Sequence, residues 1–369
     1  MRITRIRLDR LIAPLDSPFE AAWDPVPRTS FSATIVRVET DEGIVGVGSG
    51  DTMDGFEAYE HLFVGTDPLA VARHVRALET IAFHAGRYWP LEAALWDIVG
   101  QVAGLPVATL FGGAIDRLPV YASSGQLLPA PARADVALRL RSEGFRAFKI
   151  RVDPADLEAG LAAVQATRRT LGDEVPIMVD LNQGWRIAGD TRAALDPVGA
   201  LRVASRLGEL GVLWVEEPLP GTDLAGLRSL RGGVTGTRVA GGEMARTFGD
   251  LLAALDADAF DVYQPDVVLA AGMSRVRTVA ETALARNRWF TPHTWTNGIG
   301  LLANLHVAAG VGGGPYLEFP YDPPAWTPER RDFMLAEPIR PDADGFLSVP
   351  ARPGLGLILD ELALQRYAA

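Results

Sequence analysis

The sequence predicts an α/β fold in which a barrel of repeated βα units follows a smaller accessory domain. The chain has 369 residues, which is more than one hydrophobic core usually supports. From residue 119 onward, short apolar strands alternate with helical segments at intervals of roughly 25–35 residues, the pattern of a parallel sheet. Eight such units favour a closed barrel over an open sheet.

The first third of the chain is predicted to contain three strands and one helical region. Residues 13–30 hold four prolines between the first two strands, and we expect them to form a surface loop. The helical pattern ends at Gly104-Leu105-Pro106, because glycine and proline stop a helix. The expected elements are strands near residues 2–9, 32–39 and 44–48 and helical structure from about 67 to 103.

The remainder of the chain supplies the barrel and a tail. The tail, residues 335–369, contains proline and glycine turns and is too short for a domain, so we expect it to pack on the first domain. This divides the chain into an accessory domain, residues 1–118 with the tail, and a barrel, residues 119–334. The predicted barrel strands are 119–123, 147–152, 176–181, 212–217, 238–242, 259–264, 288–293 and 315–319.

Composition excludes several kinds of site and partner. The formal net charge is −11 and no basic stretch is present, so we expect no nucleic-acid partner. The absence of cysteine excludes disulfides, thiolate metal ligands and cysteine nucleophiles. The N-terminal residues alternate as in a strand and lack the apolar core of a signal peptide, and no stretch is apolar enough to cross a bilayer. We therefore expect a cytoplasmic protein without membrane contact.

Lys149 is the only lysine among 35 basic residues. Arginine can supply a positive charge elsewhere, so this exception suggests an ammonium whose pKa can be lowered until it exchanges a proton. A stray lysine is the plain alternative. Lys149 lies in a predicted strand whose side chains alternate between two faces, so that Lys149 and Arg151 share one face. A strand with two cations on its inner face is typical of an active-site wall.

Carboxylates end three consecutive predicted strands. Asp180 shares a strand face with Asn182, Glu216 ends the next strand, and Glu243 follows the one after that. Each acid alone could equally cap a helix or pair with an arginine. Together they converge only if the strands are adjacent and parallel, and hard oxygen ligands on rigid elements suit Mg²⁺. By strand alternation, Glu217 is expected to face away from this site and to form a structural pair.

The next strands end in a candidate general base. Asp266 follows the sixth predicted strand and His293 ends the seventh. A carboxylate beside an imidazole fixes its tautomer and raises its basicity. Glu318 in the eighth strand could hydrogen-bond a substrate carboxylate or act as an acid. The other histidines have no comparable neighbours and are expected to be structural or exposed: His61, His74, His84 and His306.

In this order the residues resemble the mandelate racemase subgroup of the enolase superfamily, over nearly the whole chain. The resemblance is specific because it combines a Lys-x-Lys-type motif, three acids, a His–Asp pair and a helix that precedes the barrel. The residues are Lys149-Ile150-Arg151, Asp180 with Asn182, Glu216-Glu217-Pro218, Gly242-Glu243, Asp266, His293, Glu318, Ala94-Leu95-Trp96-Asp97-Ile98 and Leu110-Phe111-Gly112-Gly113.

The resemblance implies a modified TIM barrel, (β/α)7β, with an α+β capping domain and an active site between them. It implies one Mg²⁺ per subunit on Asp180, Glu216 and Glu243, and removal of a proton α to a carboxylate to give a metal-stabilised enediolate; the enolase superfamily is itself the standard example of this chemistry. Relatives are commonly symmetric oligomers, so we expect a homo-oligomer acting on a small carboxylate.

Arg151 departs from the family pattern, since a lysine base stands at this position in racemases of the subgroup. Arginine stays protonated at ordinary pH, which argues against racemisation by two bases. Lys149 would then act as an electrophile on the substrate carboxylate, Arg151 as a clamp and His293 as the chief base. This arrangement predicts dehydration of an acid sugar to a 2-keto-3-deoxy acid. A racemase, epimerase or cycloisomerase remains the alternative, and a barrel that only binds a carboxylate is a third reading.

Substrate specificity is expected in loops of the capping domain that close over the barrel mouth. The candidate segments are residues 14–30, with Trp23 and Arg28, and residues 49–57. Trp295, just beyond a strand end, could also shape the pocket. Each of these residues could instead belong to a solvated turn or to ordinary packing. The expected substrate-binding residues are Asn182, Trp23, Arg28 and Trp295.

Overall fold

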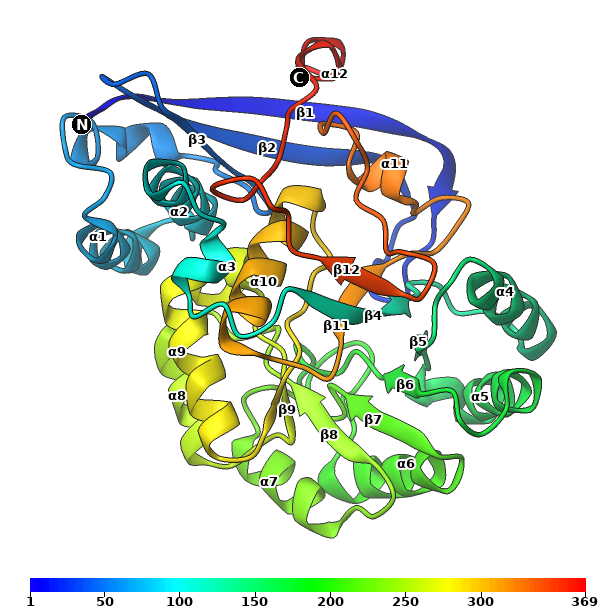
Figure 1. Ribbon diagram of the computed structural model, residues 1–369. Coiled ribbons are helices and arrows are strands. Elements are labelled where there is room, and N and C mark those ends of the chain that lie inside the picture. The colour runs from blue at the N-terminus through cyan, green and yellow to red at the C-terminus, as the bar shows by residue number, and fades with distance from the viewer.

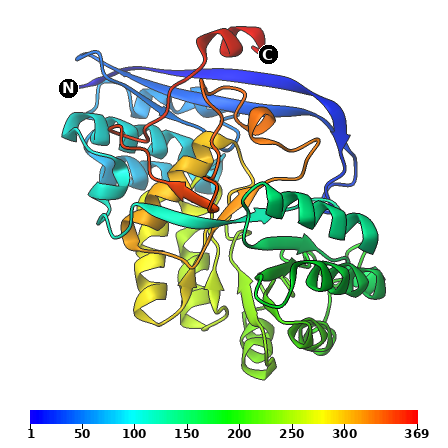
Figure 2. The ribbon, with the colours of Figure 1, turned by 45° about the vertical axis from the view of Figure 1, so that its right-hand side comes forward.

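The computed structural model describes residues 1–369 and places a three-stranded antiparallel sheet across the mouth of a barrel of parallel strands (Figure 1). Helices of the first part of the chain lie beside the barrel at one end of that sheet (Figure 2). The elements of the first part of the chain are β1 (Ile3–Phe19), β2 (Arg28–Thr40), β3 (Val45–Gly48), η1 (Phe56–Ala58), η2 (Glu60–Leu62), α1 (Val71–His84), α2 (Trp89–Ala103) and α3 (Val107–Leu110).

The prediction of a loop over residues 13–30 is wrong for most of its length. Strand β1 continues to Phe19 and β2 begins at Arg28, so only residues 20–27 connect them. Pro14 lies in the β1–β2 ladder. This is possible because β1 is the edge strand of its sheet, where a residue without an N–H group is tolerated. The helical region predicted from 67 to 103 is likewise divided into α1 and α2.

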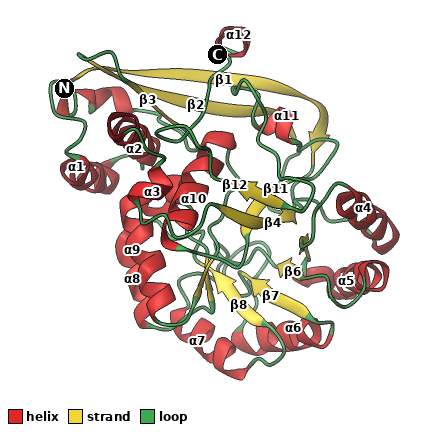
Figure 3. Cartoon of the chain, in the orientation of Figure 1, coloured by secondary structure: helices red, strands yellow, loops and turns green.

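The barrel strands follow chain order around the sheet, and each neighbouring pair is parallel (Figure 3). The order is β10-β9-β8-β7-β6-β5-β4-β11. The strands are β4 (Arg117–Ser123), β5 (Phe148–Arg151), β6 (Ile177–Asp180), β7 (Val212–Glu216), β8 (Arg238–Gly241), β9 (Val262–Tyr263), β10 (Trp289–Phe290) and β11 (Leu317–Pro320). Beyond the end of β10, Thr294 donates hydrogen bonds to Glu318 of β11, from N to Oε2 (2.8 Å) and from Oγ1 to the carbonyl oxygen (2.8 Å).

Seven helical connections alternate with the eight strands, so the predicted (β/α)7β class is confirmed. Most strands occur close to their predicted positions, although β9 and β10 have only two residues each. The connecting helices are α4 (Ala130–Ser142), η3 (Pro154–Asp156) with α5 (Leu157–Leu171), α6 (Pro197–Glu209), α7 (Leu224–Gly233), α8 (Phe248–Asp256), η4 (Val267–Ala271) with α9 (Gly272–Ala285) and α10 (Gly298–Val311).

Strand alternation places the site residues directly above a plug of buried side chains. In β5, Phe148 and Ile150 pack outward in the main core, while Lys149 and Arg151 point inward. The barrel interior is filled by Tyr121, Ala147, Met178, Trp214, Ala240 and Val262. In β5, β6 and β7, the residue two positions after the plug residue of that strand also points inward and is a charged residue of the site. The period of two along each strand therefore puts a dry layer beneath the site.

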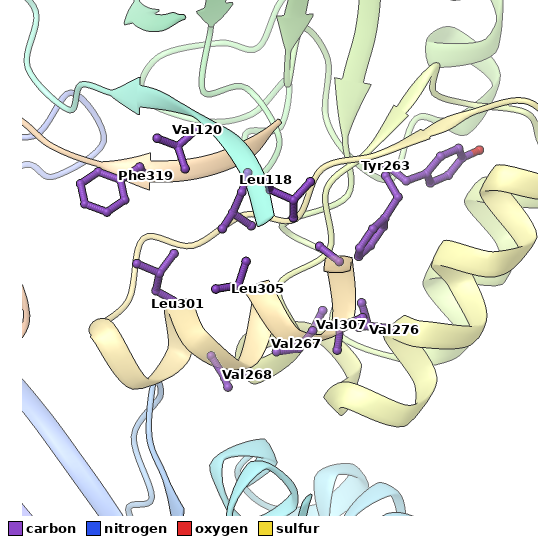
Figure 4. Close-up of a cluster of buried hydrophobic side chains, with 14 of the residues drawn as sticks. Leu118, Val120, Tyr263, Val267, Val268, Val276, Leu301, Leu305, Val307 and Phe319 are labelled. Atoms are coloured by element: carbon purple, nitrogen blue, oxygen red, sulfur yellow. The ribbon is translucent and has the colours of Figure 1, made fainter. Parts of the chain in front are cut away.

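Helix α10 packs against the outside of the barrel and anchors the main core. Figure 4 shows Leu301 and Leu305 of α10 facing side chains of β4 and β11, while Val307 lies beside Val276 of α9. All of these belong to one cluster of 69 buried residues, which also includes residues of the capping sheet such as Ile35. A second cluster of 17 residues lies between that sheet, α1 and α2. The two domains therefore share a core while the first domain keeps one of its own.

The C-terminal tail contacts both parts of the fold. The tail contains β12 (Phe346–Ser348) and α12 (Glu361–Arg366). The short helix α11 (Pro328–Arg331) lies just before the tail in the chain. Strand β12 pairs with barrel strand β4, and Ala368 forms a bridge with Leu11 of β1. No helix is both long and apolar enough to span a membrane.

Asp97 of α2 joins the tail to the first domain. Its carboxylate accepts hydrogen bonds from the backbone N–H groups of Val47 (3.0 Å) and Leu355 (2.7 Å) and from the amide of Gln101 (2.9 Å). Burial raises the pKa of Asp97 to about 6, from an ordinary value of 3.8. The folded protein therefore holds this proton at pH values where the unfolded chain has lost it.

We predict that wild-type stability falls relative to an Asp97→Asn variant as the pH rises from 4 to 7. Between about pH 4 and 6 the folded state binds more protons than the unfolded state, so this group's contribution is present at low pH and is lost as the pH rises through 6. The asparagine side chain does not titrate. The difference in free energy of unfolding, measured in urea at pH 4 and 7, should change by about 2–3 kcal/mol. A difference that is independent of pH would contradict the assigned shift.

Candidate active site

Three carboxylates meet at the ends of adjacent strands. Asp180 ends β6 and is the register partner of Glu216 in β7, while Glu243 lies two residues beyond β8. One carboxylate oxygen from each residue lies within 4.8 Å of the other two. Asp180 and Glu216 are buried, and Glu243 is nearly so. The sequence prediction that these acids converge therefore agrees with their placement.

The triad fits a divalent cation. The Oε2 atom of Glu243 is buried and has no hydrogen-bond partner. Burial raises the pKa of Glu243, and the nearby charge of Glu216 raises it further. Burial also raises the pKa of Asp180, against the opposing effect of Arg151. Buried carboxylates this close repel one another, and hard oxygen donors on rigid strands are what Mg²⁺ and similar ions bind.

Lys149 is buried among carboxylates. Its Nζ atom lies 2.5 Å from Glu216 Oε1, 2.6 Å from Glu318 Oε1 and 3.6 Å from Asp180 Oδ2. Burial lowers the pKa of Lys149, but the charges of Glu216 and Glu318 outweigh it, and the net pKa is raised. The expectation of a lowered lysine pKa is therefore wrong. Lys149 is suited to supply a fixed positive charge rather than to exchange a proton.

Arg151 is held rigidly in the second position of the motif. Its Nε atom donates to the carbonyl oxygen of Ser124 (2.8 Å), and Nη1 donates to Asp180 and to Asn182 Oδ1 (3.2 Å). Burial lowers the pKa of Arg151, but the surrounding carboxylates, Asp180 first, raise it above its ordinary value. The guanidinium therefore stays charged and cannot act as a base.

Two tryptophans cover the Arg151 guanidinium. Its central carbon lies 4.7 Å from the ring centroid of Trp23 and 5.6 Å from that of Trp295, at cation–π distance. Trp23 belongs to the 20–27 connection of the capping domain, whereas Trp295 follows β10 of the barrel. The two rings pack edge to face, with centroids 4.8 Å apart. The capping domain thus closes one side of the site directly over Arg151.

His293 and Asp266 form the expected pair. The Nδ1 atom of His293 lies 3.1 Å from Asp266 Oδ2, and its Nε2 atom lies 3.8 Å from Glu243 Oε2. Burial lowers the pKa of His293, but Glu243 and Asp266 outweigh it and raise the pKa to about 9. The bond to Asp266 leaves Nε2 free to face the triad, which is the geometry that a general base requires.

Glu318 is fully engaged by its neighbours. Oε1 accepts from Ser123 Oγ (2.7 Å) and contacts Lys149, while Oε2 accepts from the backbone N–H of Thr294 (2.8 Å). Burial raises the pKa of Glu318, but Lys149 and His293 lower it below its ordinary value. An ionised Glu318 orients Lys149, and the suggested role as an acid finds no support in this arrangement.

A cavity of about 260 Å³ opens above these groups. All four residues predicted to bind substrate line it, although they come from three separate parts of the chain. Trp185 and Met244 complete the wall, and the sequence gave no signal for Met244. The lining residues are Trp23, Arg28, Arg151, Asn182, Trp185, Glu243, Met244, His293 and Trp295.

Other predicted residues lie away from this cavity. Glu217 lines a separate cavity of about 350 Å³, as expected from its outward direction. Its Oε2 atom has no partner, so the expected structural pair is absent. His306 is structural: Nδ1 accepts from Ala108 N (3.0 Å), and Nε2 lies 3.1 Å from the carbonyl oxygen of Leu355.

Sequence reasoning missed two buried amides that contact the site. Gln264 donates from Nε2 to Glu216 Oε2 (2.9 Å), and Asn304 donates from Nδ2 to Asp266 Oδ1 (2.9 Å). Gln264 is the last residue of the predicted strand 259–264, so strand alternation could have identified it. Asn304 lies inside an apolar helix, where no local pattern identifies its partner.

Comparison with known proteins places the chain in a family. Residues 8–112 match the mandelate racemase / muconate lactonizing enzyme N-terminal domain, and residues 132–363 match the enolase C-terminal domain-like family. A 3,6-anhydro-α-L-galactonate cycloisomerase from Streptomyces coelicolor is 32% identical over 99% of both chains, and an L-talarate/galactarate dehydratase from Salmonella typhimurium is 28% identical over 98% of this chain and 90% of its own. A racemase from Streptomyces coelicolor with bound magnesium is 30% identical, with a TM-score of 0.84 over 100% of both chains. The resemblance in the sequence is confirmed, and the chain belongs to the mandelate racemase subgroup of the enolase superfamily.

Proposed function

We propose that this enzyme removes the proton α to the carboxylate of an acid sugar and then expels the β-hydroxyl as water, giving a 2-keto-3-deoxy acid. The observation that carries the proposal is the asymmetry of the site. A His–Asp base lies on one side of the cavity, while the second base position holds an arginine that is hydrogen-bonded to Ser124, Asp180 and Asn182 and is covered by Trp23 and Trp295. Relatives of this chain include dehydratases of acid sugars.

His293 carries both proton transfers in this scheme. A cation on the triad would offset the charge of Glu243 that raises the His293 pKa, and the neutral imidazole would then take the α-proton at Nε2. Asp266 stabilises the imidazolium that results. The same imidazolium then returns a proton to the β-hydroxyl oxygen as the C–O bond breaks, so that water leaves and an enol remains. Addition of a proton to the former β-carbon and loss of the proton on the enol oxygen, both exchanged with water, convert this enol to the 2-keto acid. Proton, electron pair and leaving group are all accounted for without an oxidant or reductant.

The cations hold the substrate carboxylate. Lys149 and the free edge of Arg151 offer N–H donors next to the triad, where the carboxylate would gain negative charge as the proton leaves. A Mg²⁺ ion held by Asp180, Glu216 and Glu243 would stabilise that charge as a Lewis acid. Glu318 keeps the Lys149 ammonium in place.

Cycloisomerisation is a second candidate, because a relative at 32% identity is a cycloisomerase. Elimination of a ring oxygen in place of a hydroxyl needs the same base and the same fixed cations, and the product keeps the mass of the substrate. Epimerisation needs a base on each face of the α-carbon, and the charged Arg151 disfavours it.

We predict that the triad binds one Mg²⁺ and that the ion stabilises the fold. At 100 times the dissociation constant, bound ion should raise the free energy of unfolding by about 2.7 kcal/mol. Glu243→Gln should weaken or remove this effect. Glu217→Gln is the matched control, because Glu217 is buried nearby but faces another cavity. Thermal unfolding with increasing MgCl₂ measures both; an unchanged response in Glu243→Gln would exclude Glu243 as a ligand.

We predict that His293→Asn abolishes turnover. The Mg²⁺-loaded wild-type enzyme should convert one or a few members of a library of mono- and diacid sugars to 2-keto acids, and the variant should be slower by about 10²–10⁴-fold or inactive. Mass spectrometry separates the candidates, since dehydration loses one water and cycloisomerisation loses none. Undiminished turnover by His293→Asn would rule out the mechanism. A protein that only binds carboxylates would yield no product with either form.

We predict that Arg151→Lys gains exchange on the second face of the substrate. A lysine there can lose a proton, whereas arginine and the control Arg151→Gln cannot. In D₂O, proton NMR of recovered substrate should show the α-epimer with Arg151→Lys alone. Epimer formation by the wild type would contradict the one-base reading.

A further inference from the structure

Asp266 lies at the start of a rare element. It is the N-cap of η4, a π-helix over Val267–Ala271 that separates β9 from α9. π-Helical turns are uncommon and occur frequently at functional sites. The Asp266 carboxylate has two distinct ends: Oδ1 accepts from the backbone N–H of Val268 (2.9 Å), and Oδ2 faces His293. The direction of this carboxylate therefore depends on how η4 is held.

Helix α10 holds η4 from one side through Asn304. This side chain is fully buried and uses both ends of its amide. Nδ2 donates to Asp266 Oδ1 (2.9 Å) and to the carbonyl oxygen of Gly300 (3.1 Å), while Oδ1 accepts from the backbone N–H of Val267 (3.0 Å). If the Asn304 amide were reversed, its NH₂ group would face the backbone N–H of Val267, and two donors would oppose each other. The orientation of the amide is therefore unambiguous. Figure 4 shows Val267 and Val268 beside α10.

Helix α2 of the capping domain holds η4 from the other side. Trp89 is buried, and its Nε1 atom donates to the carbonyl oxygen of Ala270 (3.1 Å). Glu92 Oε1 accepts from Ser274, from the backbone N–H at 2.9 Å and from the hydroxyl at 2.5 Å. The chain passes so close to α2 that a Cβ atom on Gly272, where φ is +79°, would lie 1.9 Å from Glu92 Oε2.

We propose that Asn304 is a positioning residue for proton abstraction and that Trp89 supports it from the capping domain. Asn304 binds Oδ1 of Asp266 and the backbone of the next residue together, so the carboxylate cannot rotate away from His293. Oδ1 of Asp266 is occupied by Asn304 and Val268, which leaves Oδ2 for His293 Nδ1. This bond keeps the imidazole with Nε2 toward the triad. The inference rests on the proposed function, because it assigns His293 as the base.

The experiment compares two buried polar residues of one helix. Asn304→Leu keeps the size of the side chain and removes its bonds to η4. His306→Leu is the matched control, because His306 is also fully buried on α10 and also bonds two neighbouring segments, but it lies away from the cavity. Both variants should lose comparable stability. Only Asn304→Leu should lower kcat, by about 10–100-fold at unchanged KM, as substitutions of residues that orient a functional group often do.

Two further readouts separate positioning from a general structural effect. An α-deuterated substrate should show a larger isotope effect with Asn304→Leu, because proton transfer limits the rate more strongly. The chain has five histidines, so ¹⁵N-histidine NMR of the Mg²⁺-loaded enzyme can identify the His293 signals through His293→Asn. Asn304→Leu should shift or broaden the Nδ1 signal, and His306→Leu should not. Trp89→Phe, which keeps a ring but loses the donor, should show a smaller decrease in kcat.

The outcomes distinguish this proposal from the one on which it rests. If His293→Asn is inactive while Asn304→Leu and Trp89→Phe keep wild-type kcat, isotope effect and Nδ1 signal, the positioning role is wrong and the proposed function stands. If Asn304→Leu raises KM at unchanged kcat, Asn304 affects substrate binding and the proposal is also overturned. If His293→Asn stays active, the proposed function itself is wrong. If Asn304→Leu does not fold, Trp89→Phe decides by the same three measurements.

Discussion

The pairing of charges in the buried layer of side chains at the barrel mouth, above the apolar plug, is the constraint on which the rest of the site depends. Buried ions are costly unless they are matched in sign and hydrogen-bonded. Four carboxylates share this layer with two permanent cations, which leaves two negative charges, and a divalent cation would balance them. The contributors are Asp180, Glu216, Glu243 and Glu318 with Lys149 and Arg151. Because they come from β5 through β8 and β11, the balance exists only when the barrel strands are assembled in order.

Much of this arrangement could be predicted from sequence because strands repeat every two residues. That period placed Lys149 and Arg151 on one face and turned Glu217 away from the triad. Local pattern did not reveal the environment of each charge. The pKa of Lys149 rises rather than falls because Glu216 and Glu318, which are 67 and 169 positions further along the chain, lie within 2.6 Å of its Nζ atom. Asn304 was missed for the same reason, since its partner Asp266 is 38 residues away and its helix is otherwise apolar.

The first domain is more than a cover for the barrel. Its 20–27 connection brings Trp23 onto Arg151, and its helix α2 supports the turn after Asp266. The first contact lies against Arg151, and the second supports the segment that follows Asp266, the partner of His293. An aromatic cluster continues from Trp23 through Phe19 to Trp295 and Trp326 and joins both domains. The shape of the site is therefore a property of the whole chain.

The solitary lysine has a consequence for chemical labelling. Lys149 is fully buried and keeps its proton, whereas only a neutral, accessible amine reacts with an acylating reagent. Succinimidyl esters should therefore leave this side chain unmodified for as long as the barrel stays closed. The rate of Lys149 acylation would then report the rate at which the fold opens, with no background from other lysines.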